Sequence, residues 1–289
     1  MPTKIEKDAI TGRDTTGHDW DGIKELNTPL PKWWLYVFYA CIAWSIGYYV
    51  LYPSWPTLSG HLNGIAGYWT RAELDKQVAV QAEQRAPFVR QINGADIGQI
   101  RRSPELYNFA LAGGRSAFAE NCAPCHGPGG GGTKGFPNLA DDDWLWGGDV
   151  ASILRTVSYG VRNANADSRQ SQMPRFGADG MLTAAQIIDV AEYVLSLSGA
   201  SRDAAAAGRG AGIFNDNCVA CHGENGKGNR EVGAPNLTDG IWLYGGDKAA
   251  LVQTIAYSRS GNMPAWSERL DPATVKMLAL YVHSLGGGE

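Results

Sequence analysis

The chain has 289 residues, enough for about two ordinary domains and some further segments. Charged residues make up 19% and the formal net charge is −4, so the composition offers nucleic acid no basic surface. Glycine (37 residues) and tryptophan (10 residues) are abundant, which is typical of a fold organised around something other than a large aliphatic core.

The N-terminal part contains one apolar span. The first 32 residues are polar and charged, so they lack the apolar stretch of a cleavable signal peptide. Residues 33–52 then contain no charge, and as a helix they extend roughly 30 Å, the thickness of a bilayer's hydrocarbon core. Aromatic residues stand at both ends, which a buried helix of a soluble domain seldom shows, and Pro53 and Pro56 end the helix. Residues 32–55 are therefore expected to form a single transmembrane anchor.

The distribution of basic residues predicts the orientation of this anchor. Lys24 and Lys32 precede the span, and no lysine or arginine follows it until Arg71. The positive-inside rule places residues 1–31 in the cytoplasm and the rest of the chain on the outer face.

Two further expectations concern the span and the segment that follows it. Cys41, the one cysteine inside it, is expected to be a small buried hydrophobe. Residues 56–107 should begin with an interfacial segment, because 58–69 is too short and polar to cross a bilayer, and continue from residue 71 as a polar helical tether.

The remainder of the chain is an internal repeat with an offset of about 96 residues. The blocks GRSAFAENCAPCHGPGG and PNLADDDWLWGGD of the first copy correspond to GAGIFNDNCVACHGENG and PNLTDGIWLYGGD of the second. Each copy continues to a Met-Pro pair and closes with an apolar helix. Several blocks in a fixed order indicate duplication of one domain. The two copies are expected to occupy residues 108–199 and 200–289.

Each copy is expected to be helical. A helix carrying Phe118 or Phe214 runs into the cysteine pair, and a middle helix begins near Asp149 or Asp247. The closing helix has apolar residues at helical spacing, which indicates one buried face.

The pattern Cys-x-x-Cys-His occurs once in each copy. Its thiols lie about one helical turn apart, so each can add to one vinyl group along a porphyrin edge, and the adjacent histidine becomes the proximal iron ligand. The pattern therefore predicts two covalently bound haem c groups in a mainly α fold, with one N-terminal transmembrane helix followed by two tandem class I cytochrome c-like helical domains. The predicted attachment sites are Cys122, Cys125, Cys218 and Cys221, and the predicted proximal ligands are His126 and His222.

Zinc and a redox dithiol are the competing interpretations of these cysteines. Structural zinc takes four ligands, commonly from two separated pairs, whereas each pair here lies in its own copy with no further cysteine downstream. A thioredoxin-like dithiol needs a strand-helix setting, which neither copy provides.

Met173 and Met263 are the candidates for the sixth iron ligand, 47 and 41 residues beyond the histidine of their own copy. The proline after each one stiffens an extended loop that can present the thioether to the iron. A thioether raises the potential and a filled sixth position excludes oxygen and peroxide, so both features suit electron transfer. Met277 is expected to fill the core, and Met181 is a rival ligand without a counterpart in the second copy.

Other recurring residues are expected to support the haems. The carbonyl of Pro137 or Pro235 can accept the second N–H of the proximal histidine and fix its tautomer. Trp144 and Trp242 are expected either to pack near the haem edge or propionates or to form part of the ordinary hydrophobic core. His18, His61 and His283 are expected to face solvent or an interface. His61 or His283 could also replace a methionine as iron ligand.

The approach to the membrane is the most specific motif in the chain. Residues 20–34 read WDGIKELNTPLPKWW, the anchor ends in LYP at 51–53, and two haem c domains follow. Over essentially the whole chain this order resembles the dihaem subunit III (CcoP or FixP) of cbb3-type cytochrome c oxidases. Some members of that family have two anchoring helices, whereas this sequence has one.

The resemblance implies a role in bacterial respiration at low oxygen, at the inner membrane with the haem domains in the periplasm. The chain would accept electrons from a soluble or membrane-tethered cytochrome c. It would relay them through two His/Met haems to a monohaem cytochrome c subunit and the catalytic haem b-copper subunit. Association with a quinol-cytochrome c reductase is a further implied contact. The chain itself would not reduce oxygen, because its span contains no histidine for haem iron or copper.

Two other functions remain open at this stage. A free-standing membrane dihaem cytochrome that shuttles electrons from a quinol-oxidising complex would show the same anchor and haem motifs. A dihaem peroxidase would need one iron with an open or displaceable ligand, which two intact Met-Pro loops disfavour.

Overall fold

The computed structural model describes residues 4–53 and 55–289. The chain divides into two compact units, Met1–Gln84 and Arg85–Glu289, and each is considered by itself. The first unit contains the apolar helix, and the second contains both copies of the repeat.

The first unit begins with a β-hairpin that the sequence analysis did not anticipate. Strands β1 (Thr15–Trp20) and β2 (Ile23–Leu26) pair antiparallel, and the connecting turn contains Asp21 at φ 50° and Gly22 at φ 91°. This hairpin is hard to predict from the sequence, because the residues that alternate along its strands are mostly exposed and polar. A second, very short hairpin, β3 (Pro56–Thr57) with β4 (Gly60–His61), follows the apolar helix.

The apolar helix α1 (Lys32–Leu51) coincides with the predicted span. It is long and apolar enough to cross a bilayer, and none of its residues is buried within the chain. The expectation that Cys41 is buried is therefore wrong for the isolated chain, because the side chain is exposed on α1. The apolar surface of α1 is available to lipid or to another protein.

Helix α2 (Thr70–Gly94) passes from the first unit into the second. The predicted polar tether is helical, but its C-terminal part belongs to the core of the second unit. Ile92 near the end of α2 and Ile100 in α3 (Ile97–Arg102) are fully buried beside Met277. Lys276 fixes this end of α2, because its Nζ donates to the carbonyls of Ile92, Asn93 and Ala95 at 2.8–3.0 Å.

The helices of the two copies correspond one to one. The first copy contains α4 (Pro104–Asn121), α5 (Ala123–His126), α6 (Val150–Tyr159) and α7 (Ala184–Leu197). The second contains α8 (Ala204–Asn217), α9 (Val219–His222), α10 (Lys248–Tyr257) and α11 (Pro272–His283). The predicted starts of the middle helices are confirmed, since Asp149 and Asp247 cap α6 and α10 with their side chains.

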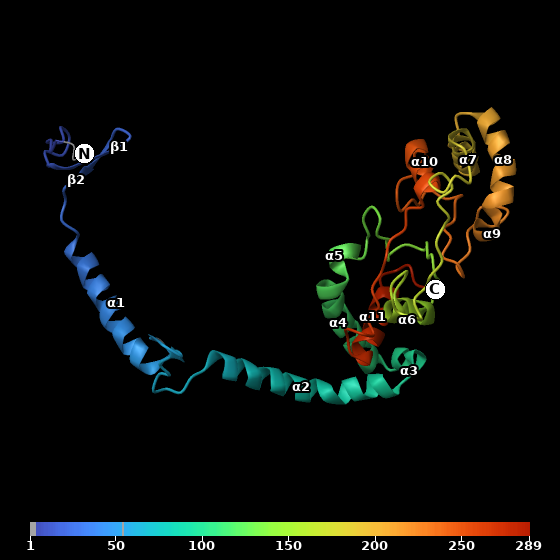
Figure 1. The fold of residues 1–289 in the computed structure, drawn as a ribbon. Helices are drawn as coiled ribbons and strands as arrows, with labels where there is room; N and C mark the ends of the chain where they lie inside the picture. Colours follow the sequence, from blue (N-terminus) through green and yellow to red (C-terminus); the bar gives the residue numbers. More distant parts are fainter. Residues whose placement is uncertain (1–3, 54) are drawn as a thin grey trace. The chain divides into compact units, whose positions relative to one another are not determined.

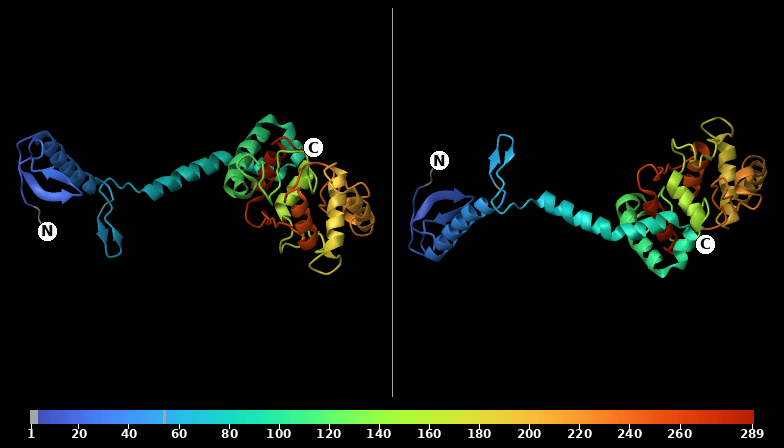
Figure 2. Two further views of the ribbon diagram at one scale, coloured as in Figure 1. Left: turned by 90° about the horizontal axis from the view of Figure 1, so that it is seen from above. Right: turned by 90° about the horizontal axis from the view of Figure 1, so that it is seen from below.

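The closing helices of the two copies are exchanged. Helix α7 packs against α8 and α10 of the second copy, whereas α11 packs against α4 and α6 of the first (Figure 1). The views in Figure 2 agree, with the red α11 beside the green α4 and the yellow α7 beside the orange α8. The expected boundary between residues 199 and 200 therefore falls between two helices that pack together.

The same close helix crossing occurs in both exchanged pairs. A Cβ on Gly114 of α4 would lie 2.3 Å from the carbonyl oxygen of Met277, and a Cβ on Gly210 of α8 would lie 2.1 Å from that of Asp189. Only glycine allows the backbones to approach this closely. One turn further on, Phe118 meets Tyr281 and Phe214 meets Tyr193 with ring centroids 5.4 and 5.0 Å apart.

Two packed domains result from this exchange. The contiguous domain consists of residues 173–259, with a core formed by α7, α8 and α10. The split domain consists of residues 85–172 and 260–289, with cores formed by α2, α3, α4, α6 and α11. The chain leaves the split domain before Met173 and returns to it before Met263, so each copy of the repeat contributes to both domains.

Candidate functional site

Each cysteine pair lies where a long helix meets a single helical turn. Cys122 ends α4, and its carbonyl accepts from the backbone N–H of Cys125 and of His126 at 3.1 and 2.9 Å. Gly127 then ends the turn with φ 79°, a conformation that favours glycine. The second copy repeats this geometry with φ 74° at Gly223. Both pairs therefore present two thiols one helical turn apart, with a histidine directly behind them.

The environment of the thiols disfavours redox dithiol chemistry. Cys122 and Cys218 are buried, and burial, with a smaller contribution from the neighbouring thiol, raises the pKa of each to about 11. Reactive dithiols have lowered thiol pKa values. Among the described residues, no three His, Cys, Asp or Glu side chains gather as metal ligands, so the zinc interpretation lacks a ligand set.

The two histidines predicted to be proximal ligands make the proline contacts that the sequence predicts. Nδ1 of His126 lies 3.0 Å from the carbonyl oxygen of Pro137, and Nδ1 of His222 lies 3.1 Å from that of Pro235. A carbonyl can only accept, so Nδ1 carries the proton and Nε2 keeps a free lone pair for a metal. Burial lowers the pKa of both histidines, although the proline contacts oppose this, and so favours the neutral imidazole.

The methionines are brought together with the histidine motif of the other copy. Met263 packs on the core of the split domain that contains Cys122, and Met173 packs on the core of the contiguous domain that contains Cys218. Met263 exchanges two backbone hydrogen bonds with Val161, 2.9 and 3.0 Å long. The expected grouping of each methionine with the histidine of its own copy is therefore not what the packing shows.

The two sets of side chains fit a covalently attached haem. Each set offers two thiols on one turn, an imidazole with a free Nε2 and a methionine in the same apolar cluster. Neutral imidazole and thioether are ligands that suit haem iron in electron-transfer proteins.

The alternative ligands lie elsewhere. Met181 is 54% exposed, and Met277 is buried in the core as predicted. Nε2 of His283 contacts the carbonyl oxygen of Glu289, and the ring of His61 lies against Trp69. His18 is stacked on Trp20 in the N-terminal hairpin.

The two recurring tryptophans pack at equivalent places. Trp144 is half-buried on the core of the split domain, and Trp242 on that of the contiguous domain. A Cβ on Gly148 or Gly246 would overlap the indole of Trp144 or Trp242 at 2.4 and 2.3 Å, so each ring is confined by a glycine. Trp144 also donates through Nε1 to the carbonyl of Gly287.

Sequence reasoning missed three arginines around the methionine loops. Arg169 and Arg259 each stand four residues before a methionine, a repeat of Ser-Arg-x-x-x-Met that could have identified them. Both donate to a threonine on the preceding helix, Thr156 or Thr254, and lie over an aromatic ring. Arg162 has no counterpart in the second copy, and only the folded chain reveals its contacts.

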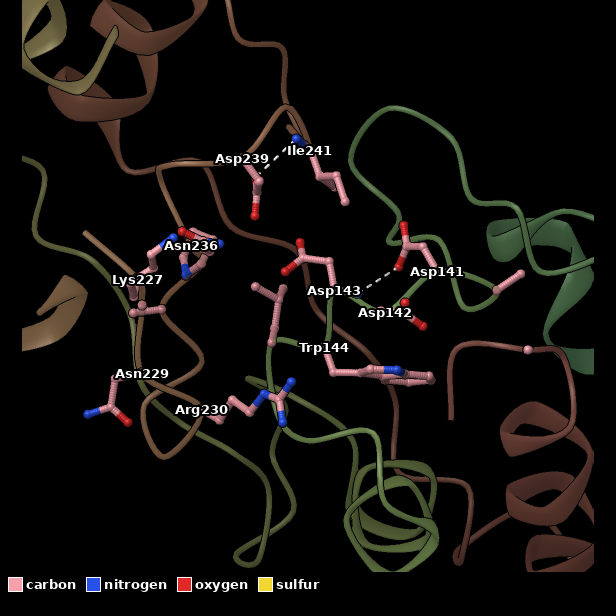
Figure 3. A pocket seen from close by; sticks show the side chains of 16 residues that line it. Asp141, Asp142, Asp143, Trp144, Lys227, Asn229, Arg230, Asn236, Asp239 and Ile241 are labelled. Carbon is pink, nitrogen blue, oxygen red and sulfur yellow. Dashed lines mark hydrogen bonds between the residues drawn. The ribbon is translucent and has the colours of Figure 1, made fainter. Parts of the chain in front are cut away.

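A cavity of about 860 Å³ lies between loops of the two copies (Figure 3). Asp143 and Asp239 face it, with Arg230 on its other side. Burial raises the pKa of Asp143, and the nearby carboxylates of Asp239 and Asp141 add to the effect. The lining contains none of the predicted cysteine, histidine or methionine ligands, but it includes Trp144 and Pro235, so the cavity adjoins the predicted haem sites.

Comparisons with known proteins agree with the motifs. A family model described as the N-terminal domain of cytochrome oxidase-cbb3, FixP, matches residues 12–59. The cytochrome c model matches 111–198, and the model of cytochrome c oxidase, cbb3-type, subunit III matches 205–282. These models follow the sequence repeat, whereas the packing exchanges its closing helices.

Curated relatives cover the full chain. The cbb3-type cytochrome c oxidase subunit CcoP of Azospirillum brasilense is 55% identical, across 98% of this chain and 99% of the relative. The FixP subunit of Bradyrhizobium diazoefficiens and the CcoP subunit of Cereibacter sphaeroides are each 52% identical across the whole of both chains.

Proposed function

Because the chain belongs to the CcoP and FixP family of cbb3-type cytochrome c oxidase subunits, we propose that it is a membrane-anchored electron-transfer subunit with two haem c groups. The observation that carries the proposal is the pair of Cys-x-x-Cys-His turns, each packed in one apolar cluster with a methionine. Haem c, when bound, supplies a one-electron ferric/ferrous couple, and a thioether ligand raises its potential.

The proposed ligand sets cross between the two copies. In the split domain, Cys122 and Cys125 would attach the haem, and His126 and Met263 would ligate its iron. In the contiguous domain, Cys218 and Cys221 would attach the haem, and His222 and Met173 would ligate its iron. This assignment is supported by the exchange of α7 and α11 and by the backbone pairing of Met263 with Val161.

The chain is proposed to be no enzyme on its own. With a histidine and a methionine at each site, neither haem iron would have a free position for oxygen or peroxide. The residues of the chain hold the two redox groups, orient the proximal imidazoles and surround the sites with apolar side chains.

The proposed partners are those that the family resemblance implies. Electrons arrive from a soluble or membrane-tethered cytochrome c and leave to a monohaem subunit and the catalytic haem b-copper subunit. Helix α1 anchors the chain, with residues 1–31 in the cytoplasm and both haem domains in the periplasm of the inner membrane. Exposed aromatic residues along α1 provide a surface for contact with lipid or oxidase subunits.

Purification in mild detergent tests the function. The chain is expected to retain two haems after denaturation and acid-acetone extraction, and to co-purify with haem b and copper. Haem c without haem b or copper would support a free-standing shuttle, and a colourless extracted chain would refute the haem sites.

A chain with a single haem tests the ligand pairing. Replacing Cys122 and Cys125 by alanine leaves only the haem at Cys218 and Cys221. In that chain, Met173→Ala should remove the far-red charge-transfer band of the ferric iron–thioether bond, whereas Met263→Ala should leave it. The reverse result would restore pairing within each copy.

A further inference from the structure

Arg162 occupies the loop where the chain crosses between the two domains. It follows α6 in the split domain, and its backbone N–H donates to the carbonyl of Arg169 at 2.7 Å. Its φ of 50° lies in the left-handed region, which non-glycine residues adopt at an energetic cost. The side chain is half-buried, and burial lowers the pKa of the guanidinium. The surrounding structure thus holds Arg162 in a backbone conformation that arginine rarely adopts.

The guanidinium of Arg162 bonds both segments that carry the methionines. Nε donates to the carbonyl of Gly261 at 2.8 Å, and Nη1 donates to the carbonyl of Ser171 at 2.9 Å. Gly261 stands two residues before Met263, and Ser171 stands two residues before Met173. The planar guanidinium of one arginine therefore fixes the equivalent position, two residues before the methionine, in both loops.

The neighbouring polar side chains hold one loop each. Asn163 donates through Nδ2 to the carbonyl of Met263 at 2.7 Å, and Ser258 donates through its hydroxyl to the carbonyl of Met173. Arg169 makes its side-chain bonds to Thr156 and to carbonyls of the split domain. Arg162 differs from these residues because its one side chain bonds to both segments directly before the methionines, at Ser171 and at Gly261.

We propose that Arg162 is a positioning residue that holds the axial methionines of both haem sites at once. This inference rests on the proposed function, because it takes Met173 and Met263 as iron ligands. The physical reason is that a thioether bonds iron weakly and needs its loop to be placed in advance. Loss of the shared anchor should therefore release both methionines, although Arg162 contacts neither thioether.

Full-length chains with both haems attached, each keeping one methionine, test the proposal. Met173→Ala leaves the thioether band of Met263, and Met263→Ala leaves that of Met173. Arg162→Gln is then added to each chain. The expected result is loss of the remaining band in both chains, with increased binding of carbon monoxide to the ferrous iron. Retention of the band in either chain would overturn the proposal.

Matched variants separate positioning from general damage. Asn163→Ala, in the same loop, should weaken the band of Met263 and leave that of Met173 unchanged. Helical content and haem content should remain at the parent level in every chain compared. If Arg162→Gln does not fold, Arg162→Lys replaces it. Lysine keeps the charge but cannot bond both carbonyls with a planar fork, so the band should weaken in at least one chain. An unchanged band in both would overturn the proposal.

The proposed function can fail separately from this inference. If Met173→Ala and Met263→Ala do not change the band at all, the ligand assignment is wrong. If each removes one part of the band and Arg162→Gln removes none, only the role of Arg162 is wrong.

Discussion

In the contiguous domain, α7 and its partner α8 are neighbours in the chain, whereas in the split domain α4 and α11 are separated by the whole contiguous domain. The contacts are nevertheless equivalent, with Gly210 under α7 and Gly114 under α11. The interior therefore depends on which helix surfaces meet and not on their order in the chain. A short connection over residues 198–203 favours an antiparallel hairpin of α7 and α8, which commits α11 to α4.

Cutting the chain provides the largest test of this comparison. A fragment of residues 160–262, which keeps Arg162 and both carbonyls that it bonds, is exported to the periplasm with haem-attachment machinery. It should fold, bind one haem and show the thioether band. It contains α7, α8, α10 and Met173 in one stretch. The repeat fragment 108–199 should lack the band, because it has lost α11 and Met263. Absorption spectra and haem staining measure both outcomes. A band in fragment 108–199 and none in 160–262 would show that the exchange is wrong.

The glycine crossing should be equally sensitive in both domains. Gly210→Ala places a Cβ against the backbone of α7, and Gly114→Ala does the same against α11. Each should destabilise its domain by about 3 kcal/mol, since the helices must separate. Thermal unfolding followed by helical circular dichroism measures the effect.

Gly212→Ala is the matched control on α8, because a Cβ there has no atom within 4 Å. It should raise stability by about 0.5–1 kcal/mol through helix propensity. Similar destabilisation by all three substitutions would contradict a specific close crossing.

Lys276 stabilises the split domain, because its ammonium donates to carbonyls at the C-terminal end of α2. Lys276→Met should cost about 2 kcal/mol through the loss of charge-assisted hydrogen bonds at a helix C-terminus. Hydrogen exchange should rise over the end of α2 while α7 and α8 keep their protection. Unchanged protection at α2 would mean that Lys276 does not hold the tether.

Glu192 makes the stability of the contiguous domain sensitive to acid. Hydrogen bonds from Lys248 first and Ser201 second lower the pKa of this buried carboxyl from 4.5 to about 2. The stabilisation is complete above pH 4.5 and is lost as the pH falls towards about 2. Because Lys248 is half-exposed, its size should be about 1 kcal/mol.

Glu192→Gln is therefore expected to flatten the acid dependence of the unfolding temperature of the contiguous domain between these pH values. The split domain, followed in the same experiment by hydrogen exchange, should keep its own dependence. An unchanged acid limb in the variant would place the titrating group elsewhere.

Much of the local structure could be predicted from the sequence. The span at 33–52, the helix caps Asp149 and Asp247 and the bonds from the histidines to Pro137 and Pro235 depend on residues close together in the chain. The N-terminal hairpin was missed because its strands are short and exposed. The burial of Ile92 and Ile100 was missed because their partners on α11 lie far away in the sequence.

The sequence by itself determined the apolar anchor, the duplication and both Cys-x-x-Cys-His turns, because each is encoded by short-range spacing. The expectation that each Met-Pro loop meets the histidine of its own copy differs from the packing, because the two copies are similar enough for either arrangement to bury the same surfaces. Only the tertiary structure decided between them, through the α7–α8 hairpin and the crossing segments that Arg162 binds together.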